Sequence, residues 1–517
     1  MAVAEPEWIR PISDRLIMLK IKSTDSNRTL LSLDDSYLFD DVHDWRAQRL
    51  TEIDLKPAKQ QLVIGEYKNV TEGRKVTHTL CRSRAAIEAL QQPTHSFTAI
   101  VNKIRSSQWL GVTGKPITDV VNIGVGGSDL GPQMASFALK EFDDESSSSA
   151  VDVHFVSSMD GGQLYAVLPI VDPETTLFVI ASKSFGTIDT FANVDTVKCW
   201  VNHVMSESAW LEHHVIGVSS NKEKMTAYGI PEHHQLSFDE GVGGRFSLWS
   251  TIGLSIAVSI GMAPFCKMLA GALAVDEHFL TVPDNDNVPV RLALNGVYLR
   301  QQKGINNLAI LPYDGRLRML PSYLQQLDME SNGKQATRDN KSLHQPTGPI
   351  LWGGFGPNGQ HAFYQHLHQG YDDFAADFVL VLNRSATRFP PQVAASLQQQ
   401  QRLSVANCLA HRRLLWWGDK SVESPRDNYP GSHASNLLLL DELTPESFGA
   451  LIAVYEHKIF IQGLLWDVNS FDQPGVEKGK KYALSVLDAL SDNQSEDFDD
   501  VTNALIDYYR QHINRDS

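Results

Sequence analysis

The stretch GVGGRFSLWS, from Gly241 to Ser250, separates two halves of the chain and carries its first functional signal. Its three glycines let the backbone turn tightly and approach a ligand closely, because no Cβ blocks either movement. Arg245 follows them directly, and an apolar run of helical length begins at Phe246. A permanently charged group with several donors suits an oxyanion at this position. The alternative interpretation is an ordinary glycine turn with a surface arginine.

Short apolar runs alternate with helical segments on both sides of this stretch. Those before it are Val120–Ile123, Val151–Val156, Leu177–Ala181 and His214–Val218, and those after it are Asn307–Leu311, Ile350–Trp352, Phe378–Leu382 and Asn436–Leu440. Uniformly apolar runs separated by crossover-sized segments are typical of buried parallel strands. The pattern predicts an α/β protein with two doubly wound parallel-sheet domains and helical additions at both ends.

The domain boundaries follow from where this alternation begins and ends. The first hundred residues show helical patterns such as Asp41–Ile53, with charges on one side and apolar residues on the other. We therefore expect a helical segment over 1–105 that packs on the larger domain, a smaller α/β domain over 106–265, a larger one over 266–490, and a tail over 491–517.

The charge balance limits the classes of partner. The 517 residues include 45 basic and 61 acidic side chains, which gives a net charge of -16. This charge disfavours nucleic acid and anionic membrane surfaces as partners, and an anionic ligand would need a locally basic site. The four cysteines contain no Cys-x-x-Cys pair, so neither a disulfide framework nor a thiolate zinc site is indicated. We expect a cytoplasmic protein.

Two further features bear on location. The first residues, MAVAEPEW, carry acids where a signal peptide would carry a basic and then an apolar region. Phe246–Cys266 has no charged residue, but its serines, glycines and proline favour a buried helix over a membrane span. A separate helix is expected after Thr444, a capping residue, because Pro445 suits the first helical position.

A glycine-rich turn follows the first expected strand, in the sequence VVNIGVGGSDLG from Val120 to Gly131. It suggests a dinucleotide site, but Asp129 occupies the place of the third glycine that this fingerprint requires. No nicotinamide cofactor is therefore expected. The backbone amides of Gly127 and its neighbours and the Ser128 hydroxyl remain candidates for holding a sugar or phosphate oxygen at a helix N-terminus.

A second loop, Ser182–Thr187, follows the expected strand Leu177–Ala181 and precedes a helix. It gathers three hydroxyl groups and one ammonium group: Ser182, Lys183, Ser184 and Thr187. Several donors beside the positive end of a helix dipole suit a phosphate monoester. The alternative interpretation is a helix cap beside an exposed lysine.

Three more segments contribute polar side chains in the second half. DMESNGK places Asp328 and Glu330 where a helix gives way to a turn, and GGFGPNGQH delivers His361 to the start of a helix. His366 and His368 lie five and seven positions after His361, which is not the spacing of a helical metal pair. No metal is expected. The last segment, FDQPGVEKGK, ends in a lysine close to a turn.

Together these segments resemble the phosphoglucose isomerase family. GGRFSLWS (243–250) and FDQPGVEKGK (471–480) match its two long signatures. Gly126–Ser128, the Ser182–Thr187 loop, MESNGK (329–334) and NGQHAF (358–363) match in order, so the resemblance covers roughly residues 45 to 490.

The resemblance implies two sugar-isomerase (SIS-type) domains and a cytoplasmic homodimer with shared active sites. It implies a cofactor-free enzyme of glycolysis and gluconeogenesis that interconverts glucose 6-phosphate and fructose 6-phosphate through a cis-enediol. By resemblance, Glu330 is the base, Arg245 stabilises the enediolate, and His361 and Lys480 assist ring opening. The expected substrate-binding residues are Gly127, Ser128, Ser182, Lys183, Ser184, Thr187 and Gln473.

The residues agree with this chemistry, because moving a proton between adjacent carbons needs a carboxylate, a cation for the oxyanion and an acid or base for the ring oxygen. Departures from the family pattern are few: Ser184 and Gly186 stand where threonines are common, and Lys478 occupies a usually apolar position. Two alternatives remain: an isomerase of another phosphosugar, such as mannose 6-phosphate, and a non-catalytic sugar-phosphate sensor.

Overall fold

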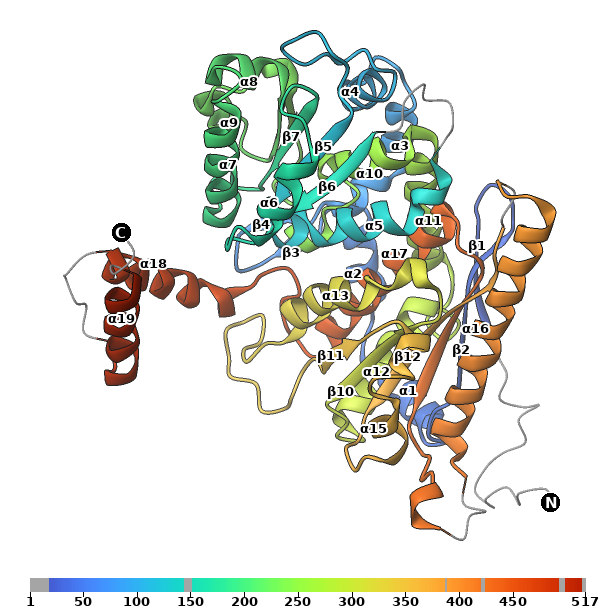
Figure 1. Ribbon diagram of the computed structural model, residues 1–517. Helices are drawn as coiled ribbons and strands as arrows, with labels where there is room; N and C mark the ends of the chain where they lie inside the picture. The colour runs from blue at the N-terminus through green and yellow to red at the C-terminus, as the bar shows by residue number, and fades with distance from the viewer. Residues whose placement is uncertain (1–17, 144–150, 386–387, 420–423, 492–497, 514–517) are drawn as a thin grey trace. The chain divides into compact units, whose positions relative to one another are not determined.

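The two groups of apolar runs form two separate β-sheets (Figure 1). The computed structural model describes residues 18–143, 151–385, 388–419, 424–491 and 498–513. The chain divides into two units, Met1–Ser470 and Phe471–Ser517. Both large sheets belong to the first unit. The second unit contains the helices α18 (Glu477–Ser491) and α19 (Asp500–Ile513).

The smaller sheet is parallel throughout, with the order β6-β5-β7-β8-β9. Its strands are β5 (Asp119–Gly124), β6 (Asp152–Val156), β7 (Thr176–Ala181), β8 (Val215–Ser219) and β9 (Gln235–Ser237). The four strands expected from the sequence are confirmed. β9 was not predicted, because three residues with one buried side chain give no recognisable pattern.

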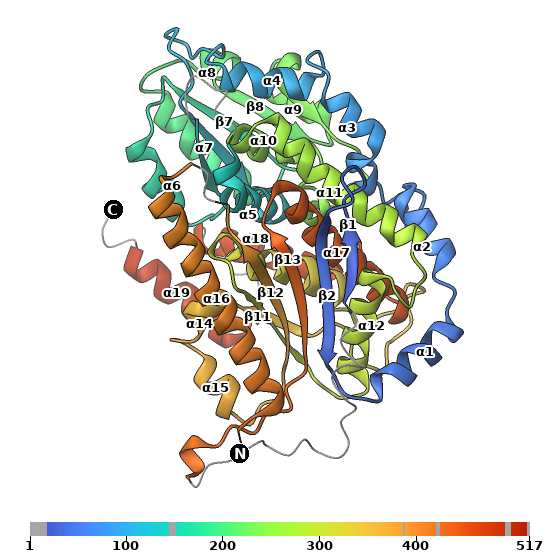
Figure 2. The ribbon, with the colours of Figure 1, turned by 90° about the vertical axis from the view of Figure 1, so that its right-hand side faces the viewer.

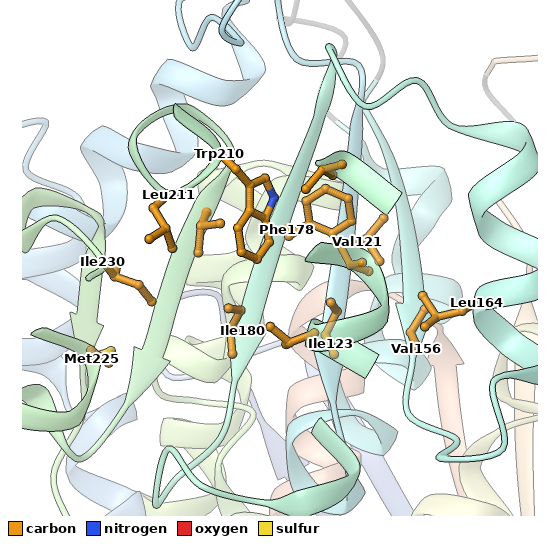
Figure 3. Packing of buried hydrophobic residues seen from close by; sticks show 14 of the residues in the cluster. Val121, Ile123, Val156, Leu164, Phe178, Ile180, Trp210, Leu211, Met225 and Ile230 are labelled. Atoms are coloured by element: carbon orange, nitrogen blue, oxygen red, sulfur yellow. The ribbon is translucent and has the colours of Figure 1, made fainter. Parts of the chain in front are cut away.

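The core of this sheet explains why its strands are apolar throughout. β7 is buried at every position, since helices cover both of its faces. Figure 3 shows Phe178 of β7 beside Trp210 of α8 (Glu207–His213), and Ile180 of β7 beside Ile123 of β5. This packing holds the carboxyl ends of β5 and β7 in a fixed relation, and both glycine-rich and hydroxyl-rich loops begin there.

The larger sheet has the order β1-β2-β13-β12-β10-β11. Its strands are β1 (Leu19–Lys22), β2 (Thr29–Tyr37), β10 (Asn307–Pro312), β11 (Ile350–Gly353), β12 (Ala375–Asn383) and β13 (Ser435–Glu442). The last four are parallel, as expected, whereas β1 and β2 pair antiparallel. Figure 2 shows blue β2 beside orange β13. The α/β class with two largely parallel sheets is confirmed.

The N-terminal segment, expected to be helical, also contains two strands, because β1 and β2 extend the larger sheet. β2 was not predicted, and it carries two adjacent carboxylates, Asp34 and Asp35, which are uncommon in a buried strand. Both are in fact neutralised from elsewhere: Arg412 donates to Asp34 Oδ2 at 2.6 Å, and Arg46 is paired with Asp35. Arg412 lies 378 residues from Asp34 and Arg46 lies 11 residues from Asp35, so a local sequence pattern predicts neither pair.

Helices surround both sheets and connect them. Those of the N-terminal part are α1 (Val42–Glu52), α2 (Lys56–Val63), α3 (Arg84–Leu90) and α4 (Ser96–Arg105). A two-stranded sheet of β3 (Lys68–Asn69) and β4 (Arg74–Lys75) lies between α2 and α3 in the sequence. Those of the smaller sheet are α5 (Leu130–Leu139), α6 (Gly162–Val167), α7 (Ile188–Val201), α8 and α9 (Lys222–Tyr228).

Later helices belong to the larger sheet and its connections. They are α11 (Met262–Thr281), α12 (Val288–Gln301), α13 (Leu320–Leu324), α14 (Gly356–Gly359), α15 (Tyr364–Gln369), α16 (Pro391–Trp417) and α17 (Pro445–Leu465), whereas α10 (Leu254–Ile260) packs on α4, α5 and β6 beside the smaller sheet. α17 packs on α11 and α12. Its start is as expected, because Thr444 and Ser447 form a reciprocal capping box.

The apolar run after Arg245 is not one helix. It begins with a 3-10 turn, Thr251–Gly253, continues as α10, and breaks at Gly261, whose φ of +88° suits glycine. Among the described helices, α17 is the one long and apolar enough to cross a membrane, and 94% of its apolar window is buried inside the protein. α17 is therefore the central core helix of the larger sheet.

Candidate active site

The smaller sheet has its topological switch point between β5 and β7. From β5 the chain crosses to β6 on one side and then returns to β7 on the other. Ligands of doubly wound sheets bind at the carboxyl ends of the strands at such a point. The loops there are Gly126–Ser128 after β5 and Ser182–Thr187 after β7, which are two of the segments singled out in the sequence.

The first loop touches the stretch that carries Arg245. A Cβ atom on Gly127 would lie 2.0 Å from the carbonyl oxygen of Gly244, so the two backbones meet at a distance that only glycine permits. Ser247 Oγ donates to the carbonyl of Gly127 at 3.3 Å. Ser128 is buried, and its carbonyl accepts from Asn122 Nδ2 at 3.0 Å. The loop is therefore held rigidly against the Gly244–Arg245 turn.

Arg245 lies in a 3-10 turn, Gly244–Phe246, and is 4% exposed. Its Nε donates to Ser331 Oγ at 2.7 Å and its Nη2 to the carbonyl of Ser470 at 2.8 Å. Its Nη1 lies 3.3 Å from Glu330 Oε1. The buried guanidinium is thus fixed on two edges and directed at a carboxylate, which is the arrangement that a developing oxyanion beside a base requires.

Glu330 ends a π-helical turn, Gln325–Glu330, that follows α13. Single π turns inside helices occur frequently at functional sites. Lys334 Nζ donates to the carbonyls of Glu330 and Ser331, at 2.9 Å each. The Glu330 side chain is 24% exposed against 3% for Arg245, so a carboxylate open to a ligand stands beside a guanidinium closed to solvent.

Gln326 is a site residue that the sequence analysis missed. A Cβ on Gly126 would lie 2.8 Å from Gln326 Nε2, which places this amide against the first loop. Its Oε1 is buried and has no hydrogen-bond partner among the described residues. The available signal was spacing, because Gln326 precedes Glu330 by four positions and so lies on the same helical face.

The second loop has the hydroxyl cluster that a phosphate site needs. Ser182 Oγ and Thr187 Oγ1 are 2.9 Å apart, while Ser184 is exposed. Phe185 has a φ of +46°, which bends the loop sharply before α7 begins. Thr187 is the N-cap of α7, and its side chain makes no capping bond, so the hydroxyl and the first amides of this 14-residue helix remain together at the loop.

The ammonium group of Lys183 already has hydrogen-bond partners within the protein. Its Nζ donates to the carbonyls of Glu240 and Val242, at 2.7 Å each, and so ties this loop to the segment that leads to Arg245. Burial, together with the nearby positive charge of Arg74, lowers the pKa of Lys183 to about 8. The ammonium group therefore links the Ser182–Thr187 loop to the segment before Arg245.

His361 lies in the turn between α14 and α15 and is exposed. It lines a cavity of about 390 Å³ together with Asp314 and Arg384, which follow β10 and β12. That position is the switch point of the larger sheet. Within the described part of the chain, no hydrogen bond or ion pair joins His361 to Arg245 or Glu330.

Lys480 and Gln473 belong to the second unit. Lys480 is on α18, where its Nζ pairs with Glu477 Oε1 at 3.0 Å, and Gln473 precedes the 3-10 turn Pro474–Val476. The structure therefore brings together Gly127, Arg245 and Glu330, links them to Lys183, and leaves the roles of these two residues as predictions. In the described ranges, no group of three or more His, Cys, Asp or Glu side chains is placed to hold a metal ion.

Comparison with known proteins agrees with this geometry. The chain is 62% identical over 487 residues to a glucose-6-phosphate isomerase of Idiomarina loihiensis, covering 94% of this chain and 99% of the relative. It is 46% identical to that of Psychrobacter cryohalolentis, covering 87% and 85%. A crystal structure of a glucose-6-phosphate isomerase from Chlamydia trachomatis superposes with a TM-score of 0.77 at 28% identity, covering 89% of each chain. The phosphoglucose isomerase family model matches residues 36–506, and the chain belongs to that family.

Proposed function

We propose that this chain interconverts glucose 6-phosphate and fructose 6-phosphate without a cofactor, through a cis-enediol. Family membership and the names of its relatives support the reaction. The observation that carries it is the 3.3 Å approach of the Arg245 guanidinium to the Glu330 carboxylate. A base and a fixed cation side by side are what proton transfer next to a carbonyl requires.

Glu330 is proposed to remove the proton from C2 of the open-chain aldose and to return it to C1. The electron pair of the broken C–H bond forms the C1–C2 double bond, and the carbonyl oxygen becomes an enediolate oxygen. Arg245 stabilises this negative charge from a position that needs no rearrangement, because Ser331 and Ser470 already hold its other edges. A proton then passes from the C2 hydroxyl to the C1 oxygen as the ketose forms.

The phosphate of the substrate is assigned to Ser182, Lys183, Ser184 and Thr187. The 2.9 Å hydroxyl pair at the start of α7 supports this assignment, since hydroxyls and helix amides together bind phosphate oxygens. Gly127 and Ser128 are proposed to line the sugar. Gln326 is added to them because its amide nitrogen lies against their loop and its amide oxygen is buried without a partner among the described residues. Gln473 is kept from the family resemblance.

His361 and Lys480 are proposed to assist ring opening, with His361 supplied by the second subunit of a homodimer. The exposure of His361 supports this arrangement, as does its place at the switch point of the other sheet. A cytoplasmic location is proposed as well, because all four cysteines are free thiols and the glycolytic role requires that compartment.

The test is an assay with fructose 6-phosphate in metal-free buffer, in which glucose 6-phosphate is followed by a coupled dehydrogenase. Steady turnover supports the proposed reaction. Mannose 6-phosphate, offered in parallel with its own product assay, examines the wider specificity. An enzyme that converts another phosphosugar and leaves fructose 6-phosphate unchanged contradicts the proposal, and binding without turnover of either sugar identifies a sensor.

A further inference from the structure

Glu330 lies between two residues that are anchored to consecutive positions of one helix. Two residues before it, Asp328 Oδ2 accepts a hydrogen bond from Lys458 Nζ of α17 at 2.8 Å. Two residues after it, Asn332 Nδ2 donates to the carbonyl of Ile459 at 3.0 Å. The turn that carries the base is therefore fixed to α17 on both sides.

The Asp328–Lys458 contact is a buried ion pair. The two side chains are 1% and 2% exposed, so neither charge is compensated by water. The second carboxylate oxygen of Asp328 is buried without a hydrogen-bond partner among the described residues. Removing one member of such a pair leaves an uncompensated buried charge, and the chain must shift to relieve it. Lys458 is the contact that keeps Asp328 in place.

A second buried carboxyl lies near Lys458 without replacing Asp328. Asp377 of β12 accepts from Asn436 Nδ2 at 2.7 Å and from the Tyr455 hydroxyl at 3.3 Å. Burial raises the pKa of Asp377, which the charge of Lys458 opposes. Asp377 thus has its own neutral hydrogen-bond donors, and the direct ion pair of Lys458 is with Asp328.

The π turn gives this pair its mechanistic importance. A π turn contains one residue more than a regular helical turn, so the direction of Glu330 depends on contacts that stabilise the wider turn. A misplacement of about 1 Å at a reacting group can lower the rate about a hundredfold. We propose that Lys458 and Asp328 are positioning residues for the proposed isomerisation: their ion pair locks the π turn and directs Glu330 at the substrate beside Arg245.

This inference rests on the proposed function, but it concerns the chemical step alone. Lys458 and Asp328 are buried and lie outside the Ser182–Thr187 loop, so their loss leaves the groups proposed to bind the phosphate in place. A misdirected base slows proton transfer while the Michaelis constant changes little. A residue that only stabilises the fold would instead lower the amount of active enzyme and leave each folded molecule with normal kinetics.

The test uses Lys458→Met and Asp328→Asn in the full-length protein, with the kinetic constants expressed per folded molecule. We expect kcat to fall roughly tenfold to a hundredfold in each variant, with KM within about twofold. The deuterium isotope effect on glucose 6-phosphate labelled at C2 should also rise, because proton transfer becomes more strongly rate-limiting. Asp328→Asn keeps the side-chain shape and covers the case in which Lys458→Met does not fold.

Lys59→Met is the matched control. Lys59 is a buried lysine of α2 paired with Asp284 at 2.7 Å, away from the Glu330 turn. The Lys59→Met substitution should lower the melting temperature and leave both kcat and the isotope effect unchanged. Wild-type kcat and isotope effect in folded Lys458→Met or Asp328→Asn would overturn the positioning role. A wild-type enzyme inactive on fructose 6-phosphate would instead refute the proposed function.

Discussion

The Ser182–Thr187 loop and the Glu330 turn belong to one candidate site but are held by different kinds of contact. The loop is called the phosphate loop below, after the role proposed for it. The loop Ser182–Thr187 is shaped by its own hydroxyl pair and by bonds from Lys183 to backbone carbonyls. The Glu330 turn is held by side chains and carbonyls of α17, which follows it by about 130 residues in sequence. Backbone acceptors are present whatever the residue, whereas an ion pair needs two particular residues. The turn therefore depends on two charged residues that need each other, Asp328 and Lys458, whereas Lys183 binds carbonyls that any residue supplies.

The largest effect is expected at the base. Glu330→Gln keeps the size of the side chain but removes its basicity, so turnover should fall at least about a hundredfold with nearly unchanged substrate binding. Steady-state kinetics and calorimetric titration with glucose 6-phosphate measure the two quantities. A variant that keeps most of its activity would show that another group is the base.

The phosphate loop should give a smaller effect of a different kind. Lys183→Ala combined with Ser184→Ala removes groups from the non-reacting end of the substrate, so affinity should weaken roughly tenfold or more while kcat changes less. Calorimetry with glucose 6-phosphate measures the affinity. Ser184→Thr, which introduces the residue common in the family, is the control and should bind normally. Unchanged affinity in the double variant would place the phosphate elsewhere.

Mixing two inactive variants tests whether His361 works with the Glu330 of its own chain. In a mixed dimer of Glu330→Gln and His361→Ala, one shared site receives both lesions and the other receives neither. With two-fold symmetry and random pairing, about half of the dimers are mixed and each has one intact site, so activity should recover to roughly a quarter of the wild-type value.

The measurement is to refold the two variants together and separately, and then to assay each sample. Native mass spectrometry shows whether mixed dimers have formed. Mixed dimers without recovered activity would mean that both residues act within one chain, and His361 would then have to approach Glu330 from its own subunit.

The smallest expected effect is a pH dependence of KM that arises from Lys183 in the Ser182–Thr187 loop. Lys183 has its pKa lowered to about 8, so its ammonium is charged below that pH and becomes neutral as the pH rises through it. Loss of this charge should raise KM a few-fold between neutral pH and about pH 9, while kcat stays level. Lys183→Arg remains charged throughout and should remove the dependence. An identical rise in KM in both proteins would assign the effect to another group.

The difference between local contacts and contacts between distant residues also explains which parts of the site could be predicted from the sequence. The glycine and hydroxyl loops were found because strand, turn and helix start are contiguous and have local patterns. The approach of Arg245 to Glu330 joins positions 245 and 330, and no spacing rule connects them; only the family resemblance paired them. Gln326, in contrast, was within reach, because its spacing from Glu330 is helical.

Charge pairing between distant residues explains why the two N-terminal strands were not predicted. Asp34 and Asp35 can lie in β2 because Arg412 and Arg46 pair with them, and no local pattern shows these pairs. The break at Gly261 was also missed, since hydrophobicity continues unbroken from α10 into α11 and only the backbone conformation changes. The expected boundary between the two α/β domains near residue 265 remains a prediction.

The pairing of β2 with β13 has a consequence for the order in which the protein is made. β2 leaves the ribosome early, but its partner, aligned as Leu33 with Leu438, is translated about 400 residues later, roughly 20 to 80 seconds at usual elongation rates. The strands of the smaller sheet lie together between residues 119 and 237, so that sheet can form during synthesis. In the meantime the β1–β2 hairpin presents an open edge to other nascent chains. Slower initiation on each message, which spaces those chains apart, should therefore raise the yield of folded enzyme.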